Sequence, residues 1–116
     1  MKLTIIIPVF NEEKTIKTII DKVLSVKLPG NLKKEIIVVD DGSTDKTRFF
    51  LSKFGDKLKL KFHNINQGKG AAINSGLKVA RGDIVLIQDA DLEYDPYYYS
   101  VLLQPILKDN AKVVYG

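Results

Sequence analysis

The sequence has no cysteine and a single histidine, His63, among its 116 residues. Without cysteine the chain has no disulfide, no thiolate metal site and no cysteine nucleophile, so we expect any metal chemistry to use oxygen ligands. The lack of cysteine is also compatible with a reducing cytoplasm, which is the expected location. His63 follows a half-exposed strand and has no evident partner in the sequence, so we expect a structural or solvent-exposed side chain.

Long hydrophobic runs are absent as well. The longest apolar stretch, Leu3–Phe10, contains Thr4 and Pro8 and is far shorter than the ~20 residues that cross a bilayer. It also lacks the small-residue cleavage site of a signal peptide. The sequence therefore predicts no transmembrane segment in this chain, and a location in the cytoplasm or peripherally at the cytoplasmic face of a membrane.

Arginine is scarce, because Arg48 and Arg81 are the only two among 18 basic residues, although the net charge is +4. Base readout and bidentate phosphate binding favour arginine, whereas these lysines are spread along helix faces and an alternating strand. We therefore expect no nucleic-acid partner. A lysine-rich surface of this kind instead attracts anionic small ligands or lipid surfaces.

The remaining composition is that of one ordinary globular domain. Hydrophobic residues make up 45% and charged residues 28% of the chain, and both values are typical of soluble domains. The length of 116 residues falls within the usual size of one domain, roughly 100 to 150 residues. We predict a single domain that spans residues 1–116.

Short β-branched runs alternate with segments of helical periodicity, a pattern that is typical of an α/β fold built on a parallel sheet. The expected strands are Leu3–Val9, Glu35–Val39, Lys57–Phe62, Ile84–Ile87 and Lys112–Tyr115. The expected helices cover Glu12–Val26 with Asn11 as N-cap, Ser43–Phe54, a segment with its apolar side from Ala72 to Ala80, and a segment from Pro96 that Pro105 interrupts. The prediction is a mainly parallel sheet with helices on both faces.

Polar loops directly follow four of the expected strands. They are residues 10–12, 40–43, 66–70 and 89–91. In a doubly wound parallel sheet, the loops after the carboxyl ends of the strands share one edge, and ligands bind there where the strand order reverses. The sequence therefore predicts one crevice that these four loops line.

The most informative loop follows Ile84–Ile87 and carries Asp89 and Asp91, one residue apart. An isolated buried carboxylate costs far more free energy than its packing returns, so the pair needs a cationic partner. Mg²⁺ or Mn²⁺ prefers carboxylate oxygens and commonly bridges them to substrate phosphates. We predict that Asp89 and Asp91 are metal ligands. Glu93 continues the alternation and is either a third ligand, direct or through water, or an exposed acid.

Other polar residues of the crevice have structural alternatives. Glu12 and Glu13 at a helix start are favoured by the helix dipole alone. For Asp41 the alternative interpretation is that it only stabilises a turn before the next helix. A pair of aspartates, Asp40 and Asp41, directly after a buried strand is however unusual for a plain turn. Lys69 lies between two glycines, where backbone can approach a phosphate closely, or it is a solvated surface lysine.

Several common nucleotide, metal and hydrolase motifs are missing. The chain has no G-x-G-x-x-G after its first strand, no G-x-x-x-x-G-K-[ST] and no G-x-S-x-G. An EF-hand that began at Asp89 would need Gly and Glu where the sequence has Tyr94 and Ser100. We therefore expect neither a Rossmann dinucleotide site, nor P-loop phosphoryl transfer, nor calcium sensing.

Four motifs follow one another along the chain: Pro8–Glu13 (PVFNEE), Val38–Asp45 (VVDDGSTD), Asn66–Gly70 (NQGKG) and Asp89–Asp91 (DAD). In order and spacing they resemble the GT-A glycosyltransferases of family 2, and the combination is specific although D-x-D alone is not. Within that family, Asp89–Pro96 and Val113–Gly116 most resemble the polyprenyl-phosphate (dolichol-phosphate type) mannosyl- and glucosyltransferases. The resemblance covers the whole chain and implies a Rossmann-like GT-A nucleotide-sugar-binding fold.

The resemblance also implies a role for each matching residue. Asp41 would contact the base or ribose, and Asp89 and Asp91 would be the catalytic residues that hold the diphosphate and its Mn²⁺ or Mg²⁺. Phe10 stands where the family more often has Tyr. Phenylalanine keeps the stacking face of tyrosine but lacks its hydroxyl. The implied nucleotide-sugar-binding set is Pro8, Phe10, Glu12, Val39, Asp41, Lys69, Asp89, Ala90 and Asp91.

The activity that the resemblance implies is metal-dependent, inverting transfer of a sugar from a GDP- or UDP-sugar, with a polyprenyl phosphate at a membrane surface as the candidate acceptor. The metal would stabilise negative charge on the leaving diphosphate. Relatives continue past the last strand with acceptor-binding segments, so this chain would be the donor-binding half. Its exposed sheet edge would favour a homo-oligomer.

Two alternatives stay open. One is a non-catalytic nucleotide-sugar-binding module or inactive donor-binding fragment, which the short chain favours and the intact acidic pair disfavours. The other is a nucleotidyltransferase of related fold. That class has a glycine-rich motif after its first strand, where this sequence has Asn11–Glu13.

Overall fold

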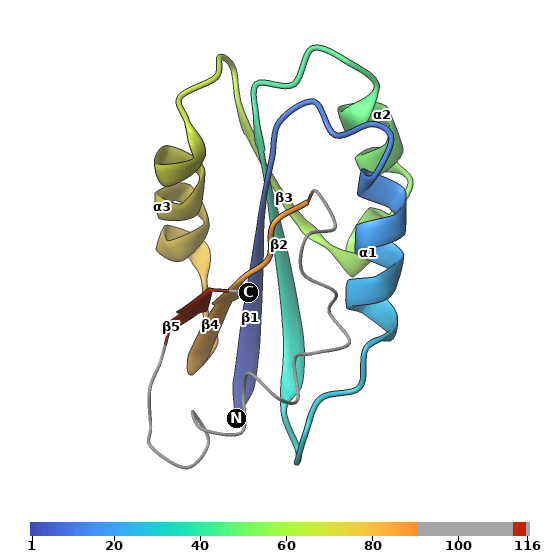
Figure 1. Ribbon diagram of the computed structural model, residues 1–116. Helices are drawn as coiled ribbons and strands as arrows, with labels where there is room; N and C mark the ends of the chain where they lie inside the picture. Colours follow the sequence, from blue (N-terminus) through green and yellow to red (C-terminus); the bar gives the residue numbers. More distant parts are fainter. Residues whose placement is uncertain (91–112, 116) are drawn as a thin grey trace.

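The computed structural model describes residues 1–90 and 113–115 of the chain. Its strands are β1 (Lys2–Val9), β2 (Lys33–Asp41), β3 (Lys59–His63), β4 (Ile84–Ile87) and β5 (Val113–Tyr115). Its helices are α1 (Ile16–Ser25), α2 (Thr47–Ser52) and α3 (Lys69–Val79), with the short 3-10 helix η1 (Gly55–Lys57) after α2. Figure 1 shows α1 and α2 on one side of a twisted sheet and α3 on the other. The predicted α/β class with helices on both faces is confirmed.

The five strands form one sheet in the order β3-β2-β1-β4-β5, and every neighbouring pair is parallel. β1 lies at the centre and pairs with β2 from Lys2 opposite Lys33 to Val9 opposite Asp40. On its other side β1 pairs with β4. The strand order reverses between β1 and β4, which is the position where parallel α/β sheets bind ligands.

Both faces of the sheet are buried, which is why its central strands are nearly continuous apolar runs. Ile5 and Ile7 of β1 belong to the core under α1 and α2, whereas Ile6 belongs to the core under α3. Alternation along one strand thus supplies two cores. α3 approaches β1 closely because it carries Gly76, where a Cβ atom would lie 2.8 Å from Ile6 Cγ2.

α1 begins later than the sequence predicts. Its first residue is Ile16 and its N-cap is Thr15, so the predicted start at Glu12 and the predicted N-cap Asn11 are wrong. Asn11 adopts a φ of +50°, a left-handed conformation that asparagine tolerates better than most residues. The N–H groups of Asn11 and Glu12 and the side chain of Asn11 form hydrogen bonds with residues 43–47, so Asn11 binds the loop after β2 and does not cap α1.

α2 is shorter than predicted for the same reason. It starts at Thr47 instead of Ser43, because the Ser43 hydroxyl accepts the Asn11 N–H at 2.9 Å. It ends at Ser52, and η1 follows at Gly55. No helix of the described residues is long and apolar enough to cross a bilayer.

The strand boundaries differ only slightly from the predicted ones. β2 extends beyond the predicted Glu35–Val39 at both ends, and β3 is Lys59–His63 instead of Lys57–Phe62. The described part of the last predicted strand is β5. The helix predicted from Pro96, with its break at Pro105, lies outside the described residues.

Glu35 is a buried carboxylate near the amino ends of the strands. Its Oε2 accepts a hydrogen bond from Lys59 Nζ at 2.6 Å, and its Oε1 accepts from Thr4 Oγ1 at 2.7 Å and from the Arg81 N–H at 2.8 Å. Burial raises the pKa of Glu35, but these hydrogen bonds outweigh burial and lower the pKa to about 2. One carboxylate therefore joins three strands and the segment before β4.

Candidate functional site

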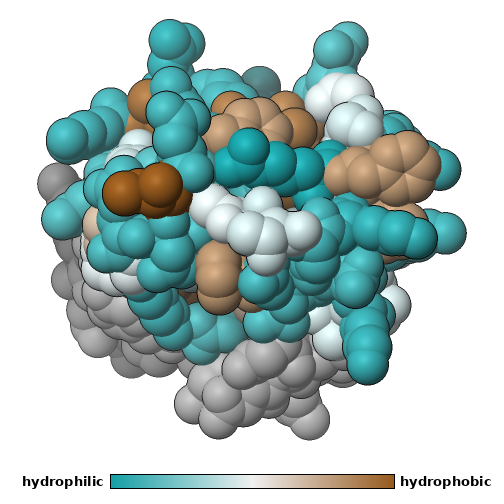
Figure 2. All heavy atoms as spheres, turned by 90° about the horizontal axis from the view of Figure 1, so that it is seen from above, coloured by the Kyte–Doolittle hydropathy of each residue, from teal (hydrophilic) through white to brown (hydrophobic). Residues whose placement is uncertain are grey.

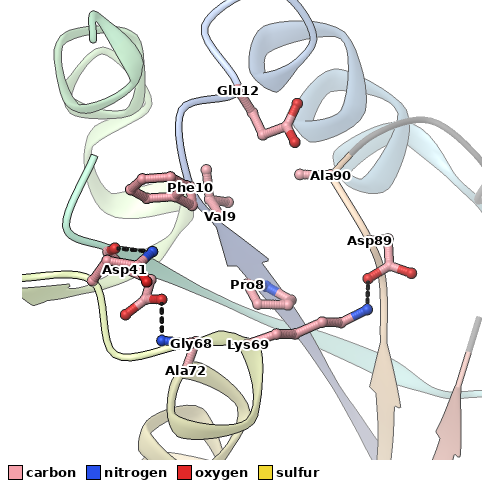
Figure 3. A pocket seen from close by; sticks show the side chains of 11 residues that line it. Pro8, Val9, Phe10, Glu12, Asp41, Gly68, Lys69, Ala72, Asp89 and Ala90 are labelled. Atoms are coloured by element: carbon pink, nitrogen blue, oxygen red, sulfur yellow. Dashed lines mark hydrogen bonds and ion pairs between the residues drawn. The ribbon is translucent and has the colours of Figure 1, made fainter. Parts of the chain in front are cut away.

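A cavity of about 560 Å³ opens at the carboxyl end of the sheet, within the usual range for ligand sites of about 300 to 1,000 Å³. Seen from above, this edge is largely hydrophilic, with separate apolar side chains between the polar ones (Figure 2). Figure 3 shows side chains from different elements around one shared space. The lining residues are Pro8, Val9, Phe10, Glu12, Asp41, Asn66, Gly68, Lys69, Ala72, Asp89 and Ala90. The predicted convergence of four loops on one crevice is confirmed.

The adjacent residues Asp40 and Asp41 lie on opposite faces of β2, as alternation along a strand requires. Asp40 faces α2, where it accepts hydrogen bonds from Arg48 Nε at 2.6 Å and from the Ser43 N–H at 3.0 Å. Asp41 faces α3 and lines the cavity. The two residues of the predicted pair therefore have different roles. Asp40 is fully buried and stabilises the loop after β2, whereas Asp41 reaches the cavity.

The Asp41 carboxylate holds the turn that precedes α3. Its Oδ1 accepts the Gln67 N–H at 2.9 Å and lies 2.7 Å from His63 Nδ1, while its Oδ2 accepts the Gly68 N–H at 2.8 Å. Burial raises the pKa of Asp41, but the His63 side chain and the two amides outweigh burial and hold that pKa below its usual value. Asp41 is therefore an ionised acceptor in the cavity wall.

The loops after β1 and β2 are tied together by hydrogen bonds between side chains and backbone. Asn11 Oδ1 accepts the Thr44 N–H at 2.7 Å. Thr47 Oγ1 accepts the Glu12 N–H at 2.9 Å, and Thr47 in turn donates its N–H to Asp45 Oδ1 at 2.9 Å. The G-S-T-D segment of the second motif thus fixes the backbone that carries Glu12 to the cavity.

A second connection joins the start of α1 to the loop after β4. Thr15 Oγ1 donates to the Ala90 carbonyl oxygen at 2.8 Å, and the same hydroxyl lies 3.0 Å from Glu12 Oε2. Figure 3 shows Glu12 and Ala90 facing each other at the edge of the cavity. The loops after β1 and β4, which flank the reversal of strand order, are therefore held at a fixed separation.

Asp89 forms an ion pair with Lys69, whose side chain extends from the start of α3 across the cavity (Figure 3). The side chains of Lys69 and Asp89 are 55% and 24% exposed, so solvent reaches both ends of this pair. Among the described residues the cationic partner of Asp89 is thus Lys69, and the role of Asp89 as a metal ligand stays a prediction. Asp91 and Glu93, the other predicted ligands, lie outside the described residues, within which no three His, Cys, Asp or Glu side chains gather.

The predicted nucleotide-binding residues reach the cavity with one exception among those described. Val39 is fully buried and belongs to the core with Ile6 and Ala72, because α3 covers this part of β2. The structure thus places Val39 beneath the cavity wall and not in the lining. The predicted residues that do line the cavity are Pro8, Phe10, Glu12, Asp41, Lys69, Asp89 and Ala90.

The predicted nucleotide-sugar-binding set omits four lining residues, Val9, Asn66, Gly68 and Ala72, although Asn66 and Gly68 lie in the loop 66–70 that the sequence predicts to line the crevice. Asn66 and Gly68 belong to the glycine-rich turn, and their residue types were a usable signal, since Asn66 Nδ2 donates to the Asp41 carbonyl oxygen at 3.2 Å. Val9 and Ala72 gave no signal, because an apolar residue at a strand end or on a helix face is normally part of the core.

His63 is the other residue whose surroundings the sequence did not reveal. Its side chain is only 11% exposed, so the structural interpretation is confirmed and the solvent-exposed one is wrong. Its partners are Asp41, at the end of β2, and Ser75, in α3. The sequence did not reveal these contacts because both partners belong to other elements than β3.

A parallel sheet with a polar cavity at its reversal of strand order defines the class of α/β proteins that bind nucleotides at that point. The sequence comparison narrows this class, because the pattern of glycosyl transferase family 2 matches residues 4–116. The chain belongs to this family, as its four motifs predict.

Named relatives agree with the family assignment. The chain is 33% identical over 100 residues to the dodecaprenyl-phosphate galacturonate synthase of Rhizobium johnstonii. This match covers 83% of this chain and 30% of that protein. It is 32% identical over 118 residues to the dolichol-phosphate mannosyltransferase of Pyrococcus furiosus. This second match covers 100% of this chain and 33% of that protein. The chain therefore spans about a third of the length of these relatives.

A solved structure confirms the GT-A type of fold. The glucosyl-3-phosphoglycerate synthase of Mycobacterium tuberculosis, crystallised with Mn²⁺, uridine diphosphate and glucosyl-3-phosphoglycerate, matches with a TM-score of 0.74 and 30% sequence identity. The match covers 91% of this chain and 39% of that chain.

Proposed function

We propose that this chain is the donor-binding part of a metal-dependent, inverting glycosyltransferase that transfers a sugar from a UDP- or GDP-sugar to a polyprenyl phosphate. The observation that carries the proposal is the cavity itself, since residues from four loops that the sequence predicts to bind a nucleotide-sugar line one space of suitable volume. The Mn²⁺ and uridine diphosphate bound by a structural relative support the same donor chemistry.

The cavity offers different chemistry at its two sides. On one side Phe10, 44% exposed, presents an aromatic face on which a nucleobase can stack, and Asp41 lies near it (Figure 3). On the other side lie Asp89 and the ammonium of Lys69. We assign the base and ribose to the Phe10 side and the diphosphate to the Lys69 side.

The second side suits the leaving group of a sugar transfer. Departure of a nucleoside diphosphate from the anomeric carbon concentrates negative charge on the diphosphate. Lys69 can turn its ammonium to a phosphate oxygen, because its side chain is largely in solvent. Asp89 and Asp91 would hold Mn²⁺ or Mg²⁺, which when bound supplies Lewis-acid stabilisation of the leaving diphosphate. The hydrogen bond from Thr15 to the Ala90 carbonyl oxygen fixes the backbone between these two carboxylates.

The proposed acceptor is a polyprenyl phosphate, because two relatives carry dodecaprenyl phosphate and dolichol phosphate in their names. Such a phosphate is already anionic, so its attack on the anomeric carbon needs no strong general base from this chain. Attack from the side opposite the leaving diphosphate inverts the configuration of the sugar. The net charge of +4 suits an anionic partner at the cytoplasmic surface of a membrane.

A nucleotide-sugar-binding module without catalysis is the second candidate. The observation that favours it is the chemistry of the described cavity residues, since the aromatic face of Phe10, the Asp41 carboxylate and the Lys69 ammonium all serve to bind a donor. Binding of the donor and transfer of the sugar therefore need separate measurements.

Calorimetric titration with UDP and GDP, each with and without Mn²⁺, tests donor binding, and transfer of radiolabelled sugar to a polyprenyl phosphate tests catalysis. We expect Asp91→Ala to remove the effect of Mn²⁺ in both measurements. Asp21→Ala, which changes an exposed acid of α1, is the matched control and should behave like the parent. Binding without transfer would favour the module, and an Asp91→Ala variant equal to the parent would contradict the metal role.

A further inference from the structure

His63 lies at the end of β3, outside the lining of the cavity but in contact with it through Asp41. Its Nδ1 is 2.7 Å from Asp41 Oδ1, and its Nε2 is 2.8 Å from Ser75 Oγ in α3. The side chains of His63 and Asp41 are 11% and 4% exposed, so water competes little for either contact. The imidazole is held from both sides, by a carboxylate and by a hydroxyl, and these two contacts fix its orientation.

The chemistry of the two partners determines which ring nitrogen of His63 carries the proton. Asp41 is ionised, since its pKa is held below the usual value, and a carboxylate only accepts hydrogen bonds. His63 Nδ1 must therefore carry the proton that it donates to Asp41. In the neutral ring Nε2 is then an acceptor, and the hydroxyl of Ser75 donates to it.

The same carboxylate accepts the N–H groups of Gln67 and Gly68, immediately before Lys69. Gly68 has a φ of +102°, which residues other than glycine rarely adopt. The direction in which Lys69 leaves the turn depends on this conformation. The orientation of Asp41 thus decides where the start of α3 lies relative to the cavity.

We propose that His63 is a positioning residue of the nucleotide site. It holds the Asp41 carboxylate in the orientation that fixes the Gln67–Gly68 turn, and with it the backbone position from which the Lys69 side chain extends. His63 does not touch the ligand in this role. The identity of the ligand as a nucleoside diphosphate rests on the proposed function, whereas the link from His63 to the turn does not.

Two near-isosteric substitutions separate the two contacts of the ring. Asn carries its amide nitrogen at the branch where His63 has Nδ1, so His63→Asn can still donate to Asp41. Gln carries its amide one bond further out, so His63→Gln reaches the Ser75 side instead. His63→Leu removes both contacts, and Ser75→Ala removes only the hydroxyl at Nε2.

The first measurement is calorimetric titration of each variant with UDP and with GDP in the presence of Mn²⁺. We expect His63→Leu and His63→Gln to bind the nucleotide that the parent prefers about tenfold more weakly, the loss expected for one charge-assisted hydrogen bond. We expect His63→Asn and Ser75→Ala to stay within about threefold of the parent, since both retain a donor to Asp41. Rescue by Asn and not by Gln would distinguish positioning from a general loss of stability.

The second measurement needs no ligand and follows the amide hydrogen exchange of Gln67 and Gly68. These amides should exchange faster in His63→Leu and His63→Gln than in the parent and in His63→Asn, while the amides of α1 stay unchanged. Equal affinities for the Leu and Asn variants, or affinities that merely follow the thermal midpoint, would overturn the proposal. If the parent binds neither UDP nor GDP, the proposed function fails, and the exchange pattern still decides whether His63 fixes the turn.

Discussion

At the scale of single residues, the cavity depends on side chains whose partners come from distant parts of the sequence. Among the described residues of the site, Lys69 and Asp89 form the most exposed ion pair, with side chains 55% and 24% in solvent. Asp40 and Asp41 are buried, and both oxygens of each carboxylate have hydrogen-bond partners. An exposed ion pair contributes little to stability. Lys69 and Asp89 can therefore exchange each other for a ligand, whereas Asp40 and Asp41 keep their protein partners, which holds Asp41 in place in the cavity wall.

Lys69→Met tests this exchange, because it removes the ammonium and keeps much of the side-chain volume. We expect the affinity for UDP or GDP with Mn²⁺ to fall about tenfold, since a charge-assisted bond to a phosphate is lost. The affinity for Mn²⁺ alone should stay equal or rise, because Asp89 loses its competing cation. Calorimetry measures both affinities, and Lys78→Met in the last turn of the same helix is the control. A variant that binds Mn²⁺ more weakly and the nucleotide unchanged would contradict this account.

At the scale of elements, the strands and α3 could be predicted from the sequence, because their signals are local. Buried parallel strands are continuous apolar runs, and β4 was predicted with the same boundaries that it has in the structure. The starts of α1 and α2 could not be predicted, since Asn11, Ser43 and Thr47 form hydrogen bonds between two loops. From the sequence alone, those residue types equally well predict helix caps.

The candidate site shows the same division. The ends of parallel strands must share an edge, so the convergence of Asp41, Lys69 and Asp89 was predictable. The pairing of Asp41 with His63 was not, because it depends on the register of β2 with β3, in which these two residues lie opposite each other. Val39 was misplaced because it belongs to the buried strand part of the motif Val38–Asp45, where α3 covers it.

The contact between α3 and β1 gives a prediction at this scale. Gly76→Val should lower the free energy of unfolding by about 1 to 3 kcal/mol, the usual cost of overpacking, since even a Cβ atom would lie 2.8 Å from Ile6 Cγ2. Asn74→Val, at an exposed position of the same helix, introduces the same side chain without the clash and should cost only a few tenths of a kcal/mol. Urea unfolding of both variants measures the difference, and equal losses would show that the helix does not rest on Ile6.

At the scale of the whole molecule, the two ends of the sheet have separate electrostatic roles. The carboxyl end carries the cavity and its exposed ion pair. The amino end carries Glu35, whose hydrogen bonds to Thr4 and Lys59 join the three strands β1, β2 and β3. Because a stabilising network lies far from the cavity, the stability of the sheet and the binding of ligand should respond to different substitutions.

The pH dependence of unfolding tests the role of Glu35. Its pKa is about 2 in the folded chain against a usual 4.5, so its contribution to stability is present above about pH 4.5 and is lost as the pH falls toward 2. A shift of this size corresponds to roughly 3 kcal/mol. Glu35→Gln should therefore unfold at lower urea than the parent near pH 7, and the difference should narrow steadily as the pH is lowered.

Asp56→Asn, a change at an exposed acid in η1, controls for the loss of one negative charge and should follow the parent at every pH. Nucleotide affinity near neutral pH should be the same for Glu35→Gln and the parent while both are folded, since Glu35 lies at the end of the sheet away from the cavity. A difference in unfolding free energy between Glu35→Gln and the parent that stays constant from pH 7 to about pH 2 would show that the carboxylate is not stabilised by its partners. A loss of nucleotide affinity in the folded variant would show instead that the two ends of the sheet are coupled.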